Sequence, residues 1–185
     1  MRRNLGPKTL LYPEPVLIIG TYDKDGKPNA MTAAWGGLSD TSEVCVCLSS
    51  EHKTVKNLVK KKAFTISIAT KKYTKECDYL GMFSGEDKPD KLEICGFHTY
   101  KSKKVDAPII QELPLTLECE LIKYDKKTGH TFAKILNVLA DENILTQGKV
   151  DIKKLDPIFY DGDTYGYYTV GKRVADAYSV YKKVK

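Results

Sequence analysis

The sequence lacks a long apolar segment. No run of residues approaches the roughly 20 consecutive apolar positions that a membrane-spanning helix requires. The N-terminus carries Arg2 and Arg3 followed by Gly6 and Pro7, without the continuous apolar stretch of a signal peptide. A disulfide framework is also missing, because the five cysteines are an odd number and lack the spacing of such a framework. We therefore expect a cytoplasmic protein without a membrane segment.

Motifs of several enzyme classes are missing as well. There is no Walker loop, no G-x-G-x-x-G fingerprint and no nucleophile elbow. Cys45 and Cys47 fall on one face of an expected strand, but no second thiol pair completes a zinc site. Glu51 and Glu93 give no persuasive pair of catalytic carboxylates. No metal site is predicted.

The composition is typical of a single globular domain, which we assign to the whole chain, residues 1–185. Hydrophobic residues make up 42% of the chain and charged residues 29%, so disorder is not expected. Twelve tyrosines favour strands, since Tyr suits a pleated surface that is wet on one side. The net charge of +6 favours anionic partners, although short lysine runs such as 60–62 are typical of solvated faces.

Apolar runs bounded by turn residues predict a chain rich in strands. We expect strands at residues 16–22, 29–35, 43–48, 64–69, 115–124, 130–140, 158–160 and 165–169. The strand at 43–48 is expected to be buried on both faces. In the strand at 115–124 the pattern puts Leu115, Leu117, Cys119 and Leu121 on one face and Thr116, Glu118 and Glu120 on the other.

Helical spacing is confined to a few short segments. Val55 and Leu58 predict a helix over 52–62, with lysines on its other face. A short helix near 75–80 precedes a loop over 84–108, whose length is usual for functional loops. Because helices interrupt the strands without alternating with them, we expect a closed antiparallel barrel and not a doubly wound parallel sheet.

The first candidate ligand-binding segment is the strand at 29–35. Its small residues let a flat ligand approach the backbone, Asn29 and Thr32 offer hydrogen bonds, and Trp35 can wall one side of a ring. Strand backbone groups also match the alternating donors and acceptors on the pyrimidine edge of a flavin. The alternative is a small-residue bend in an ordinary barrel strand.

The second candidate segment lies where a strand ends and the helix at 52–62 begins. Free amides and the dipole at a helix N-terminus favour an anion, and this segment adds hydroxyl donors and positive charge. The residues concerned are Ser49, Ser50, His52, Lys53 and Thr54. The alternative is an ordinary N-cap made by Ser50 or Thr54. Together the two segments match a mononucleotide better than either does alone.

These residues carry a resemblance to the flavin reductase-like, FMN-binding split-barrel family, which includes flavoredoxin. The most specific block is Tyr12-Pro13-Glu14-Pro15-Val16 with residues 25–35. The likeness continues in Ser49, His52, Lys53, Thr54 and Asn57, then in Asp78-Tyr79-Leu80-Gly81, Ser84-Gly85 and Lys91, and then in Gly129-His130, Pro157-Ile158 and Tyr165. Many relatives have Arg where this chain has His52 or Lys53, so a weaker and more pH-dependent phosphate contact is expected.

The resemblance implies a six-stranded antiparallel split barrel of Greek-key type with a few short helices, usually as a homodimer with FMN near the subunit boundary. It implies that Asn29, Ala30, Met31, Thr32 and Trp35 line the isoalloxazine and ribityl chain. It places Ser49, Ser50, His52, Lys53 and Thr54 toward the phosphate end, and Lys91, His130 and Tyr165 near the ring. It also implies that Asn57 is a cofactor-binding residue.

Three functions follow as hypotheses. The first is a reductase that takes electrons from NAD(P)H through bound FMN to an acceptor. It needs no acid–base side chain, but a positive charge from Lys91 or protonated His130 would stabilise the anionic reduced flavin. The second is a flavoredoxin-type carrier with tightly bound FMN and a redox protein as partner. The third, which we consider the weakest, is a basic barrel that binds single-stranded nucleic acid, so no nucleic-acid partner is expected.

Overall fold

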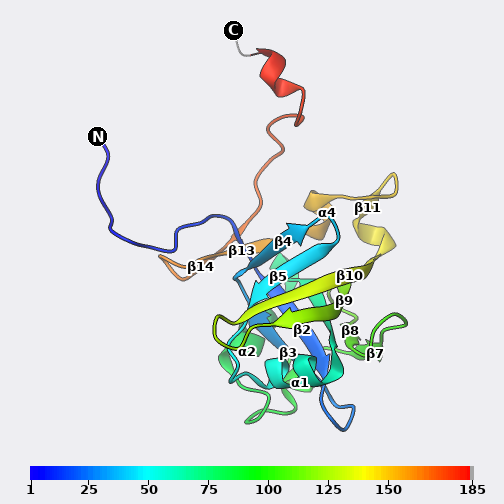
Figure 1. Cartoon of the computed structure of the whole chain (residues 1–185). Coiled ribbons are helices and arrows are strands. Elements are labelled where there is room, and N and C mark those ends of the chain that lie inside the picture. Colours follow the sequence, from blue (N-terminus) through cyan, green and yellow to red (C-terminus); the bar gives the residue numbers. More distant parts are fainter. Residues whose placement is uncertain (184–185) are drawn as a thin grey trace.

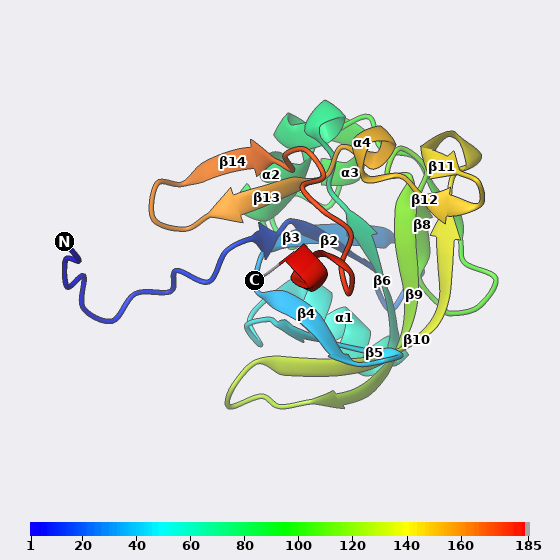
Figure 2. The same ribbon diagram turned by 90° about the horizontal axis from the view of Figure 1, so that it is seen from above.

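A strongly curled antiparallel sheet forms the centre of the molecule. The computed structural model describes residues 1–183, and within them seven strands pair in the order β3-β2-β6-β9-β10-β5-β4. The strands are β2 (Leu17–Tyr22), β3 (Pro28–Ala33), β4 (Gly36–Asp40), β5 (Glu43–Cys47), β6 (Ala63–Ile68), β9 (Leu115–Tyr124) and β10 (His130–Ala140). Figures 1 and 2 show the sheet curling round, with β3 and β4 at its two ends. The mainly β class and the antiparallel split barrel are confirmed. The expectation of a closed barrel is wrong for the described strands, because β3 and β4 do not pair with each other.

Shorter elements surround this sheet. The helices are α1 (Lys53–Lys61), α2 (Thr74–Met82), α3 (Lys91–Ile94) and α4 (Ile152–Leu155), with short 3-10 turns at Lys71–Tyr73, Glu142–Ile144 and Val180–Lys183. The small strands are β1 (Glu14–Pro15), β7 (Thr99–Lys101), β8 (Pro108–Ile110), β11 (Leu145–Thr146), β12 (Lys149–Val150), β13 (Ile158–Asp161) and β14 (Gly166–Thr169). They form a β1-β13-β14 sheet and two hairpins, β7-β8 and β11-β12.

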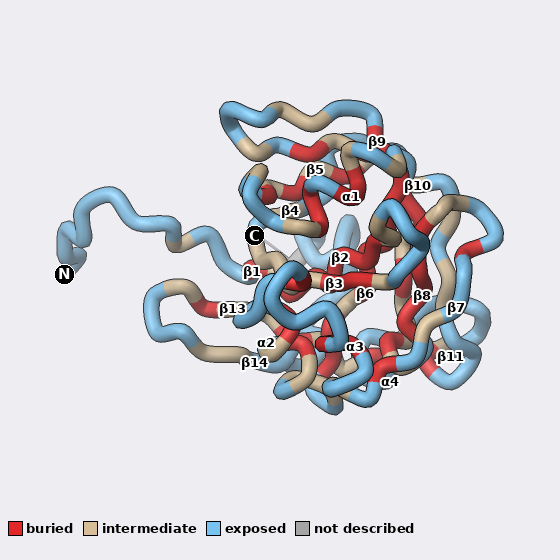
Figure 3. Tube along the Cα trace, turned by 90° about the horizontal axis from the view of Figure 1, so that it is seen from below, coloured by how far each residue is buried: buried red, intermediate tan, exposed pale blue. Residues whose placement is uncertain are grey.

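Two hydrophobic cores lie on opposite faces of β2. Leu17 and Ile19 face the barrel interior with Phe64 and Leu58, whereas Ile18 faces a second core under α2 and α3. The tube in Figure 3 shows buried segments concentrated in the strands that lie between the two cores. Because side chains alternate along a strand, burial on both faces explains why β2 reads as an unbroken apolar run.

Helix α1 lies across one end of the barrel (Figures 1 and 2). Val55 and Leu58 lie in the barrel core, while Lys60 is exposed on the opposite side. The helix ends where Lys62 adopts a left-handed conformation (φ 57°), whose amide donates to the Leu58 carbonyl. The helix predicted over 52–62 is thus confirmed to within one residue at each end.

The sheet has one strand more than the six expected. The predicted strand at 29–35 is too long, because β3 ends at Ala33 and the chain then crosses to the other edge of the sheet as β4. A Cβ on Gly36 would lie 2.6 Å from Val46 Cγ1, so glycine is what lets β4 approach β5 at this point. Two adjacent glycines gave β4 no strand signal in the sequence.

The prediction that 43–48 is buried on both faces is wrong. In β5 burial alternates, with Val44 and Val46 buried and Cys45 and Cys47 only half-buried. An apolar run of five residues does not distinguish a doubly buried strand from one whose second face is partly exposed. The two cysteines are among the five free thiols of the chain.

The sequence pattern also assigns the wrong environment to part of β9. Thr116 and Glu118 were expected opposite the buried face, yet both are 1% exposed. The Glu118 carboxylate accepts hydrogen bonds from Ser102 and, at 2.5 Å, from Asn137 Nδ2. The hairpin β7-β8 covers this face. The prediction that 84–108 is a loop is therefore wrong in part, because that stretch contains α3 and β7.

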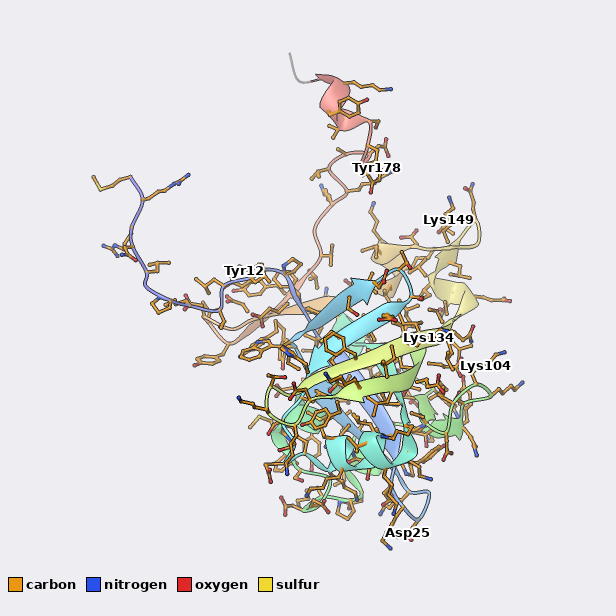
Figure 4. The ribbon with its side chains drawn as sticks, in the orientation of Figure 1. Tyr12, Asp25, Lys104, Lys134, Lys149 and Tyr178 are labelled. Carbon is orange, nitrogen blue, oxygen red and sulfur yellow. The ribbon has the colours of Figure 1, made fainter. Side chains whose placement is uncertain are left out.

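Both chain ends leave the body of the molecule. Residues before β1 and after β14 extend away from the sheet, and Tyr178 on the C-terminal arm is 96% exposed (Figures 1 and 4). The N-terminal arm is held at two points: the Tyr12 hydroxyl donates to the Asp161 carboxylate at the end of β13, and the Lys8 ammonium group donates to Asp163 at 2.5 Å. Among residues 1–183 no helix is long and apolar enough to cross a membrane.

Candidate functional site

The edge strand β3 and the start of helix α1 are joined by a buried hydrogen bond. Asn29 Nδ2 donates to Thr54 Oγ1 at 2.8 Å, and both residues are almost completely buried. Asn57, one turn further along α1, donates in the same way to Thr21 Oγ1 at 3.2 Å. These paired polar groups fix the helix N-terminus against the strand that the sequence marked as a ligand-binding segment.

The first amides of α1 are available to an anion. His52 is the N-cap residue, with extended backbone and no side-chain capping bond, so neither Ser50 nor Thr54 makes the ordinary cap considered above. The His52 carbonyl accepts hydrogen bonds from the amides of Val55 and Lys56. No acceptor within residues 1–183 pairs with the amides of Lys53 and Thr54. Unpaired amides at a helix N-terminus form an anion-binding arrangement.

Lys53 adds a positive charge to this arrangement. Its ammonium group lies 3.5 Å from Asp23 Oδ2 and 3.4 Å from the Gly85 carbonyl oxygen, and its side chain is only 16% exposed. Hydrogen bonds from Lys27 and Asp25 amides and the charge of Lys53 lower the pKa of Asp23 despite the opposing effect of burial. These contacts therefore hold the Lys53 ammonium group close to the N-terminus of α1.

Gly85 closes the site from the other side. A Cβ at this position would lie 2.0 Å from Asn29 Oδ1 and 3.1 Å from the Cδ of Lys53. The loop after α2 therefore approaches Asn29 and Lys53 as closely as only glycine permits. The three residues form a compact wall beside the free amides of α1.

Strand β3 is the outermost strand of the main sheet and pairs only with β2 among the strands described. Its outer edge therefore offers backbone donors and acceptors to a flat ligand. Its side chains divide between two faces: Met31 packs toward the barrel core, whereas Ala30 lies in the core under α2. Thr32 is on the Ala30 face, where its hydroxyl donates to the Cys77 carbonyl of α2. A ring can therefore meet the edge backbone but not all of these side chains.

The segment before α1 is attached to the β9-β10 hairpin. The Leu48 amide donates to the Gly129 carbonyl at 2.9 Å, and His130 pairs in register with Cys47. His130 is exposed, and Ser49 and Ser50 follow directly along the chain. The structure thus brings His130 near the predicted anion-binding segment, which is about 80 residues away in the sequence.

Lys91 is buried and does not lie on the surface. Its ammonium group donates to the carbonyls of Leu80 (2.9 Å) and Phe83 (2.8 Å), and the residue is 2% exposed. It therefore caps the C-terminal end of α2. Burial lowers the pKa of Lys91 to about 8, with a smaller lowering from Lys53 and an opposing effect of Cys95.

Two aromatic candidates lie apart from the anion-binding end. Trp35 is 56% exposed and lines a cavity of about 460 Å³ with Pro13, Pro15 and Cys47. Tyr165 is 81% exposed at the β13-β14 turn, with φ 57°, and lines a different cavity that includes Thr32. The two rings therefore occupy separate cavities of the single chain.

Comparison with known proteins now gives the family. The model of the flavin reductase like domain matches residues 9–167, which is most of the chain. This chain belongs to the flavin reductase-like family. The matched residues run from the segment before β1 to β14, so they include both candidate segments and the hairpin with His130.

Solved structures of family members have the same fold. The flavoredoxin of Desulfovibrio vulgaris (Miyazaki F) is 37% identical, with a TM-score of 0.93 over 97% of this chain and 98% of that one. The flavoredoxin of Methanosarcina acetivorans is 27% identical, with a TM-score of 0.90 over the whole of both chains. An FMN-binding domain of a flavin reductases-like enzyme from Shewanella baltica shares the fold at 20% identity (TM-score 0.80, 88% and 89% covered).

Two residues of the family motifs make contacts that the sequence alone does not reveal. Gly85 gives no sign of the close approach that it permits, because the approach depends on Asn29 and Lys53 far away in the chain. Asp78 accepts a hydrogen bond from Tyr167, 89 residues later. Both glycine and tyrosine are common in loops and strands, so only the folded arrangement identifies these contacts.

Replacing Lys91 by methionine tests the buried amine. The pKa of Lys91 is about 8 in the folded chain and 10.5 in the unfolded chain. Between these two pH values the unfolded chain keeps a proton on Lys91 that the folded chain has released, so folding becomes more favourable as pH rises. The cost of the buried charge is fully present below about pH 8. We expect the free energy of unfolding of the unmodified protein, relative to K91M, to increase by about 2 kcal/mol from pH 7 to pH 10.

Urea unfolding of both proteins at the two pH values measures this difference, because every other titration cancels between them. A difference between the two proteins that does not change with pH would contradict the lowered pKa of Lys91. Lys88→Met, on the exposed part of the same loop, is the matched control and should show no such pH dependence.

Proposed function

We propose that this protein binds FMN and acts as an oxidoreductase that passes electrons from NAD(P)H through the flavin to an acceptor. The single observation that carries the proposal is the pair of free amides at Lys53 and Thr54, one hydrogen bond away from the outer strand β3. This arrangement has an anion-binding end and a flat edge of backbone groups, as a mononucleotide requires. Family membership supports the same conclusion.

The residues present suit such a ligand. The amides of Lys53 and Thr54, the Lys53 ammonium group and the His52 ring would hold the phosphate, with Ser49 and Ser50 as hydroxyl donors. Asn29 and Asn57 would act by fixing the helix against β2 and β3. The close approach of Gly85 leaves no side chain between Asn29 and the loop. Asp23 already pairs with the Lys53 ammonium group, so the free amides, the hydroxyls and the remaining N–H donors of Lys53 would meet the phosphate.

The ring would lie along the outer edge of β3, over the backbone of 30–32. Bound FMN supplies the hydride and electron chemistry, which the side chains do not provide. His130 is exposed beside the anion-binding segment and can bring positive charge when protonated. Lys91 uses two of its three N–H donors on carbonyls, so one remains for a ligand. Trp35 and Tyr165 would flank the ring from the two neighbouring cavities.

A second candidate function is electron transfer between proteins with tightly held FMN. It is favoured by the two similar structures named flavoredoxin, at 37% and 27% identity. We also propose that the chain is one domain that forms a homodimer. A cytoplasmic location would keep its five free thiols reduced.

The absorption spectrum of the purified protein tests the proposal. We expect a yellow protein, or a colourless one that takes up added FMN, whose flavin absorbance is bleached by NADH or NADPH without oxygen. Retained FMN that neither nucleotide bleaches would favour the carrier. A protein that is colourless and does not bind added FMN would refute flavin binding altogether.

A further inference from the structure

A cavity of about 430 Å³ lies between β3, α2 and the β13-β14 hairpin. Thr32, Ala33 and Ala34 form the wall from the end of β3, and Asp78, Gly81 and Met82 form the wall from α2. Tyr160, Tyr165 and Tyr167 complete it from the hairpin, together with Val16. Because it shares Thr32 with the strand proposed to carry the flavin ring, a molecule in this cavity would lie next to that ring.

The tyrosines make this cavity suitable for a flat ring. The ring centroids of Tyr160 and Tyr167 are 5.8 Å apart, and the ring planes are tilted by 51°. Aromatic pairs in such tilted arrangements are favourable beyond the area that they bury. Tyr165, at the tip of the hairpin, is exposed and can cover a ring that enters.

One carboxylate gives the cavity its charge. Asp78 is the sole charged side chain among the described residues that line it. Its Oδ1 accepts a hydrogen bond of 2.7 Å from the Tyr167 hydroxyl, which ties the hairpin to α2. Burial and this carboxylate raise the pKa of Tyr167 well above its ordinary value, so the hydroxyl stays a donor and holds Asp78 in place. The second oxygen, Oδ2, has no bond among the described residues.

We infer that this cavity binds a flat one- or two-ring molecule that is uncharged or cationic, and that the charge of Asp78 weakens the binding of anionic rings. The inference rests on the proposed function, and it names the class of ring compound that can reach the flavin. A nicotinamide ring belongs to this class, and an aromatic carboxylate does not. Asp78 sets the specificity through its charge, whereas Tyr167 positions it.

Three probes of equal size and different charge test this: benzamidine as a cation, neutral benzamide and anionic benzoate. Each is titrated into FMN-treated protein and followed by the amide shifts of Gly81 and Tyr167, which locate the binding. We expect benzoate to bind at least about fivefold more weakly than benzamide, because a partly exposed like charge is worth about 1 kcal/mol. Benzamidine should bind at least as well as benzamide.

The variants separate charge from positioning. In Asp78→Asn the affinity for benzoate should come within about twofold of that for benzamide, because the like charge is gone. Tyr167→Phe keeps the carboxylate, so the order of the three probes should persist. Equal binding of benzoate and benzamide by the unmodified protein, an unchanged order in D78N, or shifts that avoid Gly81 would each overturn the inference.

FMN uptake is recorded separately by the flavin spectrum. If the protein takes up no FMN but discriminates between the probes as expected, the proposed function fails and the cavity assignment stands. If FMN binds and the probes show no charge preference, the cavity assignment fails and the proposed function stands.

Discussion

Replacing Lys53 by methionine is expected to weaken FMN binding by about ten- to hundredfold, the usual range for losing a charged hydrogen bond to a phosphate. The ammonium group of Lys53 is largely buried between Asp23 and the Gly85 carbonyl, at the N-terminus of α1. Binding of riboflavin, which has no phosphate, should change by less than about twofold. Quenching of flavin fluorescence measures both affinities.

The matched control is Lys60→Met, which removes the same charge from the exposed C-terminal part of the same helix. It lowers the net charge equally but lies away from the free amides. Its FMN affinity should therefore stay near that of the unmodified protein. If K53M and K60M weaken FMN binding alike, or if K53M weakens riboflavin as much as FMN, the phosphate is not bound at this helix.

Replacing Gly85 by alanine is expected to lower the free energy of unfolding by about 2 kcal/mol, as overpacking of a tight site does. The added Cβ would lie 2.0 Å from Asn29 Oδ1, and Asn29 cannot move freely because its amide is bonded to Thr54. If the loop moves instead, Lys53 loses the Gly85 carbonyl. We therefore also expect FMN affinity to fall by at least about tenfold.

Gly37→Ala is the control, because a Cβ at Gly37 meets no atom within 4 Å and its backbone is not in the left-handed region. Urea unfolding and FMN titration of the two variants separate the crowding at Gly85 from the general effect of losing a glycine. An alanine at residue 85 that is as harmless as one at residue 37 would show that the loop after α2 does not press on Asn29.

The strands that local sequence predicts well are those bounded by clear turn residues. β6 and β10 are confirmed nearly residue for residue, since apolar and β-branched residues bounded by turns carry the signal. The start of α1 is predicted equally well, because helical spacing and the preceding strand end are both local. Family membership was likewise visible in the motifs at 12–16 and 25–35, and the domain match confirms it.

What the sequence did not predict depends on contacts between distant segments. Glu118 is an ordinary exposed-face residue by alternation, and only the β7-β8 hairpin with Ser102 makes its position a buried one. Lys91 is a surface residue by composition, but two helix-end carbonyls hold it inside. Each polar side chain is buried because its partners come from elsewhere in the chain, and a single sequence does not reveal such partners.

The unpaired edge at β4 has a consequence for samples of this protein. The strand holds Gly36 and Gly37, and next to them Leu38 is 75% exposed. A free strand edge with an exposed apolar side chain is a template on which further chains can add by backbone pairing, and a charge such as that of Asp40 opposes this growth. Concentrated solutions should therefore aggregate more readily when added salt screens such charges.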